Sequence, residues 1–279
     1  MVGKKVLVIG GGFGGARAAI TARTLLGPEH EVTLIDRNRR VYLCGAMPSL
    51  IIGERERLSS SRSLGTLVHR GIRYIEAEVK ELDLSEKTVK TAVNKLDYDY
   101  LVIAAGVEYD WDAVPGSSYA HSFYSMQTAL RLRRKLNNFR KGKIVVAISA
   151  LPYKCPPAPY EAAMLLDWQF TRRGHRNDIA IEVTTPEPAP LPVAGADAVS
   201  RLGRVLQRKR ISLRTNVGVT EIDPSGRELT FNSGESTDVN LLITVPIHRP
   251  SGLVRNTNLM GKNGWVAVDP ETLETKEVG

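Results

Sequence analysis

The chain is poor in cysteine and has no long apolar run. Its 279 residues include two cysteines, Cys44 and Cys155, too few for a disulfide-stapled scaffold or a multi-cysteine metal site. No apolar run approaches the roughly 18 residues that cross a bilayer, and Lys4 and Lys5 leave no room for a signal peptide before the first apolar segment. The five histidines are scattered without metal spacing. We therefore expect a cytoplasmic or peripheral membrane protein that binds no metal.

Basic residues exceed acidic residues by 38 to 30, a net charge of +8. They gather at 131–143, 172–176 and 201–214, where helical spacing indicates solvated helix faces, so we expect no nucleic-acid partner. Hydrophobic residues make up 42% of the chain and charged residues 24%, as is typical of a globular protein. At roughly 150 residues per domain, the length predicts two domains.

Two parts of the chain show a strand, helix, strand order. Apolar strands at 5–9 and 31–36 flank an alanine-rich helix at 16–26. The order repeats with a strand at 143–149, a helix at 159–171 and a strand at 179–184. Because strands joined by crossover helices pair in parallel, the sequence predicts an α/β fold with two doubly wound units.

Shorter patterns fill the remaining chain. Residues 40–54 look irregular, and alternation over 79–103 is typical of a β-meander that ends in a strand at 100–104. The other expected elements are helices at 64–69, 125–139 and 196–209, strands at 73–77 and 239–245, and an extended pair formed by 212–223 and 228–232.

The turn after the first strand fits the pattern G-x-G-x-x-G. Gly10 permits the tight turn, Gly12 lets the backbone approach a pyrophosphate, and Gly15 lets the helix pack on the strand. Unpaired N–H groups at the start of the helix favour phosphate there. Asp36, at the end of the second strand, is placed to accept hydrogen bonds from ribose hydroxyls. The predicted dinucleotide-binding residues are Gly10, Gly12, Phe13, Gly14, Gly15, Asp36 and Arg37.

The corresponding turn of the second unit, residues 151–161, contains no glycine and four prolines. The bulky pair Tyr153 and Lys154 and the prolines cannot cradle a pyrophosphate through close backbone approach. We infer that the second unit has lost nicotinamide binding. One nucleotide site beside a cysteine loop favours a flavoprotein whose electron donor is not NADH.

Cys155 lies on this proline-stiffened loop at the start of a helix. The helix dipole and the charge of Lys154 are expected to lower the pKa of its thiol, and Glu161 in the first helical turn is a candidate proton carrier. The alternative is that Cys155 is a small buried hydrophobe and Glu161 an ordinary surface acid. The residues alone do not separate these two interpretations.

Four segments resemble a known family. K-C-P-P-A-P-Y-E at 154–161, V-Y-L-C-G-A-M-P-S-L-I-I-G-E at 41–54, Y-D-Y-L-V-I-A-A-G at 98–106 and N-G-W-V-A-V-D at 263–269 are similar to the flavoprotein subunit of flavocytochrome c sulfide dehydrogenase. They also resemble the related sulfide:quinone oxidoreductases. The proline-flanked cysteine motif is the specific part, whereas the glycine turn and the A-A-G segment belong to the wider superfamily of disulfide-reductase-like flavoproteins.

The resemblance implies an FAD-dependent oxidoreductase that oxidises sulfide or a small sulfur compound and passes electrons to cytochrome c or quinone. It implies that Cys155 accepts sulfide sulfur as a persulfide, that Glu161 is an acid/base near the flavin, and that Ala105 and Gly106 help to bind FAD. Cys44 matches the cysteine that bonds covalently to the flavin in the flavocytochrome branch. The same position resembles the active-site cysteine of coenzyme A disulfide reductases.

The resemblance also implies a domain layout. A discontinuous FAD-binding domain is expected at 1–114 and 247–279, with 265–268 returning to it. A second Rossmann-like domain at 115–246 is inserted into the first, with the cysteine loop in place of its glycine turn.

The sequence departs from the family pattern in two places. Val266 stands where the flavocytochrome branch has the partner cysteine of its redox disulfide. The chain stops at Gly279, before the expected Gly-Asp motif and the carboxy-terminal domain that faces the redox partner, so a truncated chain is implied. Any peripheral membrane association is expected through that missing part.

Two alternative functions stay open at this point. One is an NAD(P)H-dependent flavin disulfide reductase that uses Cys44, which the glycine-free second turn disfavours. The other is a non-catalytic, truncated protein with the FAD fold, which Val266 and the missing Gly-Asp motif favour.

Overall fold

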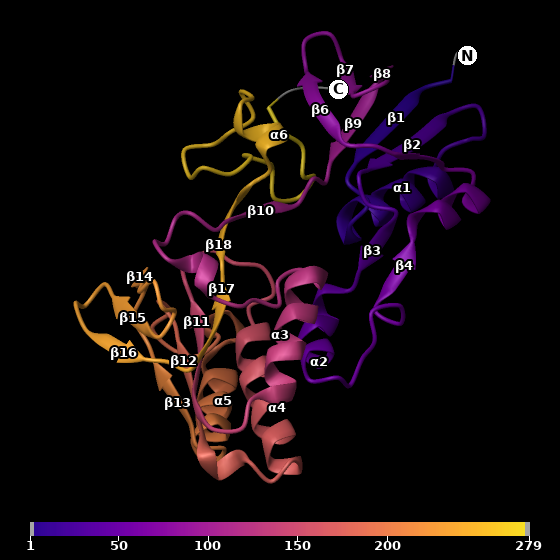
Figure 1. Cartoon of the computed structure of the whole chain (residues 1–279). Coiled ribbons are helices and arrows are strands. Elements are labelled where there is room, and N and C mark those ends of the chain that lie inside the picture. The colour runs from indigo at the N-terminus through magenta and orange to yellow at the C-terminus, as the bar shows by residue number, and fades with distance from the viewer. Residues whose placement is uncertain (1–2, 277–279) are drawn as a thin grey trace. The chain divides into compact units, whose positions relative to one another are not determined.

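The computed structural model describes residues 3–276, which divide into two compact units. Within these residues, unit 1 comprises 3–42, 61–108 and 249–276, and unit 2 comprises 43–60 and 109–248. Each unit contains its own four-stranded parallel sheet (Figure 1). The predicted α/β fold class is confirmed.

The sheet of unit 1 has the strand order β5-β2-β1-β9. Its strands are β1 (Lys5–Ile9), β2 (Glu31–Asp36), β5 (Arg73–Glu76) and β9 (Tyr100–Ile103), with helix α1 (Phe13–Leu25) joining the first two. Val8 and Leu34 lie in a buried cluster with Ala19 of α1 on one face of the sheet. On the other face, Ile9 and Ile35 pack with Val89. Both faces of the sheet are therefore covered, as parallel sheets require.

Unit 1 also contains several short elements. They are β3 (Arg40–Tyr42) paired with β4 (Ser61–Ser63), the 3-10 helix η2 (Leu64–Arg70), the meander β6 (Val79–Asp83), β7 (Thr88–Thr91) and β8 (Lys95–Asp97), and helix α6 (Gly252–Arg255). Strands β10 (Val107–Asp110) and β18 (Ile247–Pro250), which pair with each other, each include residues of both units.

The sheet of unit 2 has the strand order β13-β12-β11-β17. Its strands are β11 (Gly142–Ile148), β12 (Ile179–Thr184), β13 (Ile211–Arg214) and β17 (Leu241–Val245). Its helices are α3 (Met126–Asn138), α4 (Ala158–Arg172) and α5 (Ala196–Arg208), and a small antiparallel sheet contains β14 (Val219–Ile222), β15 (Glu228–Phe231) and β16 (Ser236–Asp238). Leu166 and Phe170 of α4 are fully buried, and α4 contacts β11 and β12.

Residues 43–60 differ from the sequence prediction in both structure and placement. The segment expected to be irregular contains the 3-10 helix η1 (Cys44–Ala46) and helix α2 (Met47–Ile51). Its apolar side chains Leu50 and Ile51 are completely buried, and Gln169 of α4 donates a hydrogen bond to the Ile52 carbonyl at 2.8 Å. In Figure 1, α2 lies beside α3 and α4. Burial of this apolar face explains why the segment belongs to unit 2, although 1–114 was expected to form one domain.

One strand prediction also changes. Residues 211–214 form β13 of the parallel sheet, and the antiparallel pair is limited to 219–222 and 228–231. Residues 265–268 lie in unit 1, where Val266 makes a bridge to Met260.

The basic run at 172–176 is not wholly a solvated face, because Arg176 is buried. Its Nε lies 2.7 Å from Oδ1 of the buried Asp167, and its other nitrogens donate to the carbonyls of Ile179 at 2.6 Å and Lys209 at 2.7 Å. The guanidinium thus ties α4 to the loops that enter β12 and β13. Among the described residues, no helix has the length and hydropathy needed to cross a membrane.

Replacing Arg176 with Met should destabilise unit 2 by about 3–5 kcal/mol, because the substitution leaves Asp167 buried with one fewer cationic partner. Urea unfolding followed by far-UV circular dichroism measures this loss. The matched control is Arg204→Met on the exposed face of α5, which should cost within about 0.5 kcal/mol. Equal losses for the two variants would contradict a structural role for the buried ion pair.

Candidate functional site

The glycine turn of unit 1 is packed more tightly than any side chain allows at two positions. Gly10 has φ +97°, and a Cβ there would lie 2.2 Å from the Ala104 carbonyl oxygen. A Cβ at Gly15 would lie 1.8 Å from the Gly10 carbonyl oxygen. A Cβ at Gly12 would meet nothing within 4 Å. Gly10 and Gly15 are therefore required by the fold, whereas Gly12 faces open space that a ligand can approach.

Helix α1 begins at this turn with free donors. Gly12 is its N-cap and provides no side-chain hydrogen bond, and its first turn carries no acidic residue. The first amides of a helix have no intrahelical partner and attract anions. The Gly11 amide instead donates to Asp36 Oδ2 at 2.6 Å, while Asp36 Oδ1 accepts from the Asn38 amide at 2.6 Å. The open cradle and the free donors fit the phosphate and ribose groups of a dinucleotide.

A cavity of about 560 Å³ lies at the carboxyl ends of the strands of unit 1. Its lining includes four of the predicted cofactor residues, namely Gly10, Asp36, Arg37 and Ala105. The remaining predicted positions of this unit, Gly12, Phe13, Gly14, Gly15 and Gly106, do not line it. The volume lies within the usual range of small-molecule sites.

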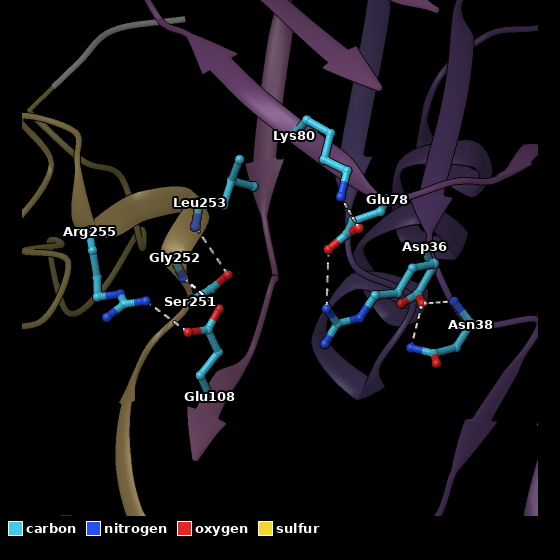
Figure 2. Close-up of polar contacts among 10 residues, drawn as sticks. Asp36, Asn38, Glu78, Lys80, Glu108, Ser251, Gly252, Leu253 and Arg255 are labelled. Atoms are coloured by element: carbon cyan, nitrogen blue, oxygen red, sulfur yellow. Dashed lines mark hydrogen bonds and ion pairs between the residues drawn. The ribbon is translucent and has the colours of Figure 1, made fainter. Parts of the chain in front are cut away.

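Sequence reasoning missed the charged walls of this cavity. Glu78, just after β5, pairs with Lys80, and this hydrogen bond is the main reason why the pKa of Glu78 lies below its usual value. Arg37 contributes a longer contact at 3.5 Å. Figure 2 shows the contact between Glu78 and Lys80. Because Glu78 follows the end of a parallel strand, the rule that ligands bind at carboxyl ends could have identified it.

The opposite wall is formed by the segment that contains α6. Glu108 accepts a hydrogen bond from the Gly252 amide at 2.7 Å and from Arg255 at 2.9 Å, as Figure 2 shows. Ser251 and Asn256 line the cavity on the same segment. No local motif marks these residues, because they are far from Glu108 in sequence.

The two cysteines line one small cavity within unit 2. Both are free thiols, Cys44 at the start of η1 and Cys155 on the loop before α4. The other lining residues are Met47, Phe123, Tyr124, Lys154 and Ala158. Cys155 has φ +57°, an unusual value for a residue with a side chain. The fold thus brings together two thiols that lie in distant parts of the sequence.

The predicted lowering of the Cys155 pKa is wrong in direction. Burial raises the pKa of the Cys155 thiol, and the negative charges of Cys44 and Glu161 raise it further. The Ala158 amide and the Lys154 charge oppose this rise without overcoming it. Burial also lowers the pKa of Lys154, whose Nζ lies 5.0 Å from the centre of the Tyr109 ring. Desolvation disfavours a thiolate more than the helix terminus favours it.

Glu161 lies in the first turn of α4, and partial burial raises the pKa of its carboxyl. Its side chain does not line the thiol cavity, although its charge acts on Cys155. Among the described residues, no group of three or more His, Cys, Asp and Glu side chains is arranged to hold a metal ion.

An aromatic group around the thiols was not predicted. Tyr109 donates a hydrogen bond to the Tyr124 carbonyl at 2.7 Å, and both rings pack edge-on against His248. The Tyr124 hydroxyl is buried without a hydrogen-bond partner among the described residues. Burial raises the pKa of Tyr124, so the hydroxyl stays protonated as a potential donor. The residues are scattered in sequence, which leaves no local signal.

Replacing Gly15 with Ala should destabilise unit 1 by about 2–3 kcal/mol, because the new Cβ would collide with the Gly10 carbonyl. Gly12→Ala, the matched control in the same turn, should cost about 1 kcal/mol or less, the usual penalty of an alanine N-cap. Urea unfolding of the two variants separates these outcomes. A larger loss for Gly12→Ala would contradict the assigned roles.

Comparisons with known proteins agree with this geometry. Residues 4–148 match the family profile of pyridine nucleotide-disulphide oxidoreductases, and residues 128–246 match the central part of the flavoprotein chain of sulfide dehydrogenase, a flavocytochrome c. Mitochondrial sulfide:quinone oxidoreductase of Mus musculus is 28% identical over 98% of this chain and 63% of its own length. Sulfide-quinone reductase of Aquifex aeolicus is 32% identical over 79% of this chain and 53% of its own length.

The X-ray structure of the sulfide:quinone oxidoreductase from Aquifex aeolicus matches with a TM-score of 0.85 at 26% identity, covering 94% of this chain and 63% of that chain. The chain therefore spans less than two thirds of the length of these relatives. The resemblance inferred from the cysteine loop is confirmed by the profile match over 128–246. Since the first profile covers the glycine turn and the whole first strand, helix, strand unit, the chain belongs to the pyridine nucleotide-disulphide oxidoreductase family.

Proposed function

We propose that this protein is an FAD-dependent oxidoreductase that oxidises sulfide, or a small sulfur compound, and passes the electrons to a quinone. The observation that carries the proposal is the single cavity lined by two free thiols, Cys44 and Cys155. The names of the relatives from Mus musculus and Aquifex aeolicus support sulfide and quinone. The match to a flavocytochrome c chain keeps cytochrome c as the alternative acceptor.

Unit 1 would hold the adenosine and pyrophosphate part of FAD. Phosphate would lie at the open Gly12 and the free amides of α1, and Asp36 would accept hydrogen bonds from ribose hydroxyls. The predicted contributions of Arg37, Ala105 and Gly106 belong to the same proposal. When bound, FAD supplies a two-electron acceptor for the oxidation of thiols and sulfide.

Cys155 is the proposed nucleophile. In the proposed step one S–S bond would form between the Cys155 sulfur and a hydrosulfide ion to give a Cys155 persulfide, and the two electrons released would pass to FAD where it is bound. Lys154 lowers the pKa of the thiol and so favours the reactive thiolate. Glu161, whose pKa is raised by burial, is the proposed proton carrier.

Cys44 is proposed as the second thiol of the reaction, because it lines the same cavity and acts electrostatically on Cys155. Its thiolate would take the outer sulfur of the Cys155 persulfide, so that an S–S bond forms at Cys44 as the S–S bond at Cys155 breaks and the Cys155 thiolate is regenerated. The alternative role, a covalent bond to the flavin, predicts that flavin stays with the protein after acid precipitation. A quinone acceptor would place electron exit at a membrane surface.

Anaerobic addition of sulfide to the purified yellow protein should bleach the flavin absorbance. Cys155→Ser should retain flavin and lose at least about 99% of the bleaching rate, since a hydroxyl is a far weaker nucleophile than a thiolate. Gly12→Val, which fills the open cradle, should lower flavin content instead. A protein without flavin would contradict the proposal, and bleaching by NADH but not sulfide would favour the disulfide-reductase alternative.

The rate at which iodoacetamide alkylates Cys155 should keep rising at pH values where the rate for an ordinary thiol has levelled off. The reason is that only the thiolate reacts and the pKa of Cys155 is raised. Lys154→Met removes a charge that lowers this pKa, so alkylation at mildly alkaline pH should slow and the profile should move to higher pH. The exposed Lys141→Met is the control and should keep the parent profile. A shift of the Lys154→Met profile to lower pH would contradict the charge assignment.

A further inference from the structure

A buried carboxylate lies beside the cysteine loop in unit 2. Glu187 is 3% exposed, and its Oε2 accepts hydrogen bonds from the hydroxyls of Tyr160 at 2.6 Å, Tyr153 at 3.2 Å and Thr185 at 3.2 Å. Its backbone is held as well, since its amide donates to Thr185 Oγ1 and its carbonyl accepts from the Asn216 amide. Burial of a charged group is costly without such partners. A carboxylate with three hydroxyl donors is therefore a built feature of the fold.

The two tyrosines remain donors to this carboxylate. Burial raises the pKa of Tyr153 and of Tyr160, and the negative charge of Glu187 raises both further. Neither phenol therefore ionises near neutral pH. The network keeps its hydrogen-bond directions throughout the pH range in which a thiol reacts.

Tyr153 connects Glu187 to the backbone on both sides of Cys155. Its one hydroxyl proton is shared between Glu187 and the Pro156 carbonyl oxygen, each 3.2 Å from the hydroxyl oxygen, so the residue two positions before the cysteine is tied to the residue directly after it. Between them, Cys155 has φ +57°. A residue with a side chain stays in this strained region only where its surroundings hold it there. The Tyr153 hydroxyl is the contact that closes the loop around the thiol.

The place of Glu187 in the fold explains why an acid is there. In a dinucleotide-binding unit, an acidic residue after the second strand accepts hydrogen bonds from ribose hydroxyls. Glu187 follows β12, the second strand of the second unit, as Asp36 ends β2 in the first. In this protein the Glu187 carboxylate accepts hydrogen bonds from the phenol hydroxyls of Tyr153 and Tyr160 and not from a ribose. Two features of unit 2 therefore oppose the binding of a nicotinamide dinucleotide. The loop after β11 has no glycine to approach a pyrophosphate, and the Glu187 carboxylate already accepts hydrogen bonds from Tyr153 and Tyr160.

We propose that Glu187 is a positioning residue that, through Tyr153, holds the Cys155 loop closed around the thiol and so controls the accessibility of its sulfur. The assignment of Cys155 as the reacting thiol rests on the proposed function, whereas the control of its accessibility by Glu187 does not. Glu187 acts directly on Tyr153 and Tyr160, while burial, Cys44 and Glu161 set the raised pKa of Cys155. Because Glu187 does not act directly on the thiol, a shift in the apparent pKa of Cys155 in a Glu187 variant reports a change in the conformation of the loop.

The test measures the alkylation of Cys155 by iodoacetamide as a function of pH in the full chain. A Cys44→Ala background makes Cys155 the only thiol, since the chain has two cysteines. Glu187→Met removes the acceptor oxygens at a similar side-chain length, and Tyr153→Phe removes the hydroxyl and keeps the ring. Each should speed alkylation about fivefold, the factor expected for the loss of one hydrogen bond, and shift the apparent thiol pKa downward as water reaches the sulfur.

Tyr160→Phe is the matched control, because it removes a hydrogen bond to the same carboxylate from α4 and not from the loop. It should lower thermal stability comparably and leave the alkylation profile within about twofold of the parent, since no contact of the loop is lost. A parent-like profile for Tyr153→Phe, or an equal shift for Tyr160→Phe, would overturn the proposal. If the profile shifts but sulfide fails to bleach the flavin of the parent chain with both cysteines present, the proposed function fails and the positioning role stands.

Discussion

Strands that run parallel all end at one edge of the sheet, and both units of this protein depend on that constraint. In unit 1 the carboxyl ends bring together Gly10, Asp36 and Ala105 around one cavity. In unit 2 the loops after β11 and β12 carry Cys155 and Glu187, which the Tyr153 hydroxyl connects. Side chains from distant parts of the sequence become neighbours because each follows a parallel strand that ends at the same edge of the sheet.

The same architecture supports two different chemistries because the first turn differs. In unit 1 the close approach of Gly15 to the Gly10 carbonyl packs α1 on the sheet and leaves Gly12 open to a ligand. In unit 2 a proline-rich turn replaces that cradle, and its tyrosine engages the buried acid. In unit 1 the start of α1 faces an open cradle, whereas in unit 2 the acid after the second strand accepts hydrogen bonds from hydroxyls of its own chain.

Burial decides the electrostatics of the thiol cavity. The helix terminus and Lys154 both favour a thiolate, yet the desolvation of Cys155 and the charges of Cys44 and Glu161 outweigh them. A thiol with a raised pKa stays protonated, and therefore less reactive, until substrate or pH changes its surroundings. The Lys154 ammonium and the Tyr124 hydroxyl, which has no hydrogen-bond partner among the described residues, both line this cavity.

The sequence by itself determined the α/β class, the first strand, helix, strand unit, and the reasons for glycine at positions 10, 12 and 15, because each depends on local periodicity and backbone sterics. Only the tertiary structure decided that 43–60 joins unit 2, that Arg176 is buried, and that the Cys155 pKa rises. It also decided that Cys44 and Cys155 share a cavity, and that Glu187 meets two tyrosines. Burial and contacts between distant residues depend on which faces pack together, and no local pattern in the chain encodes that.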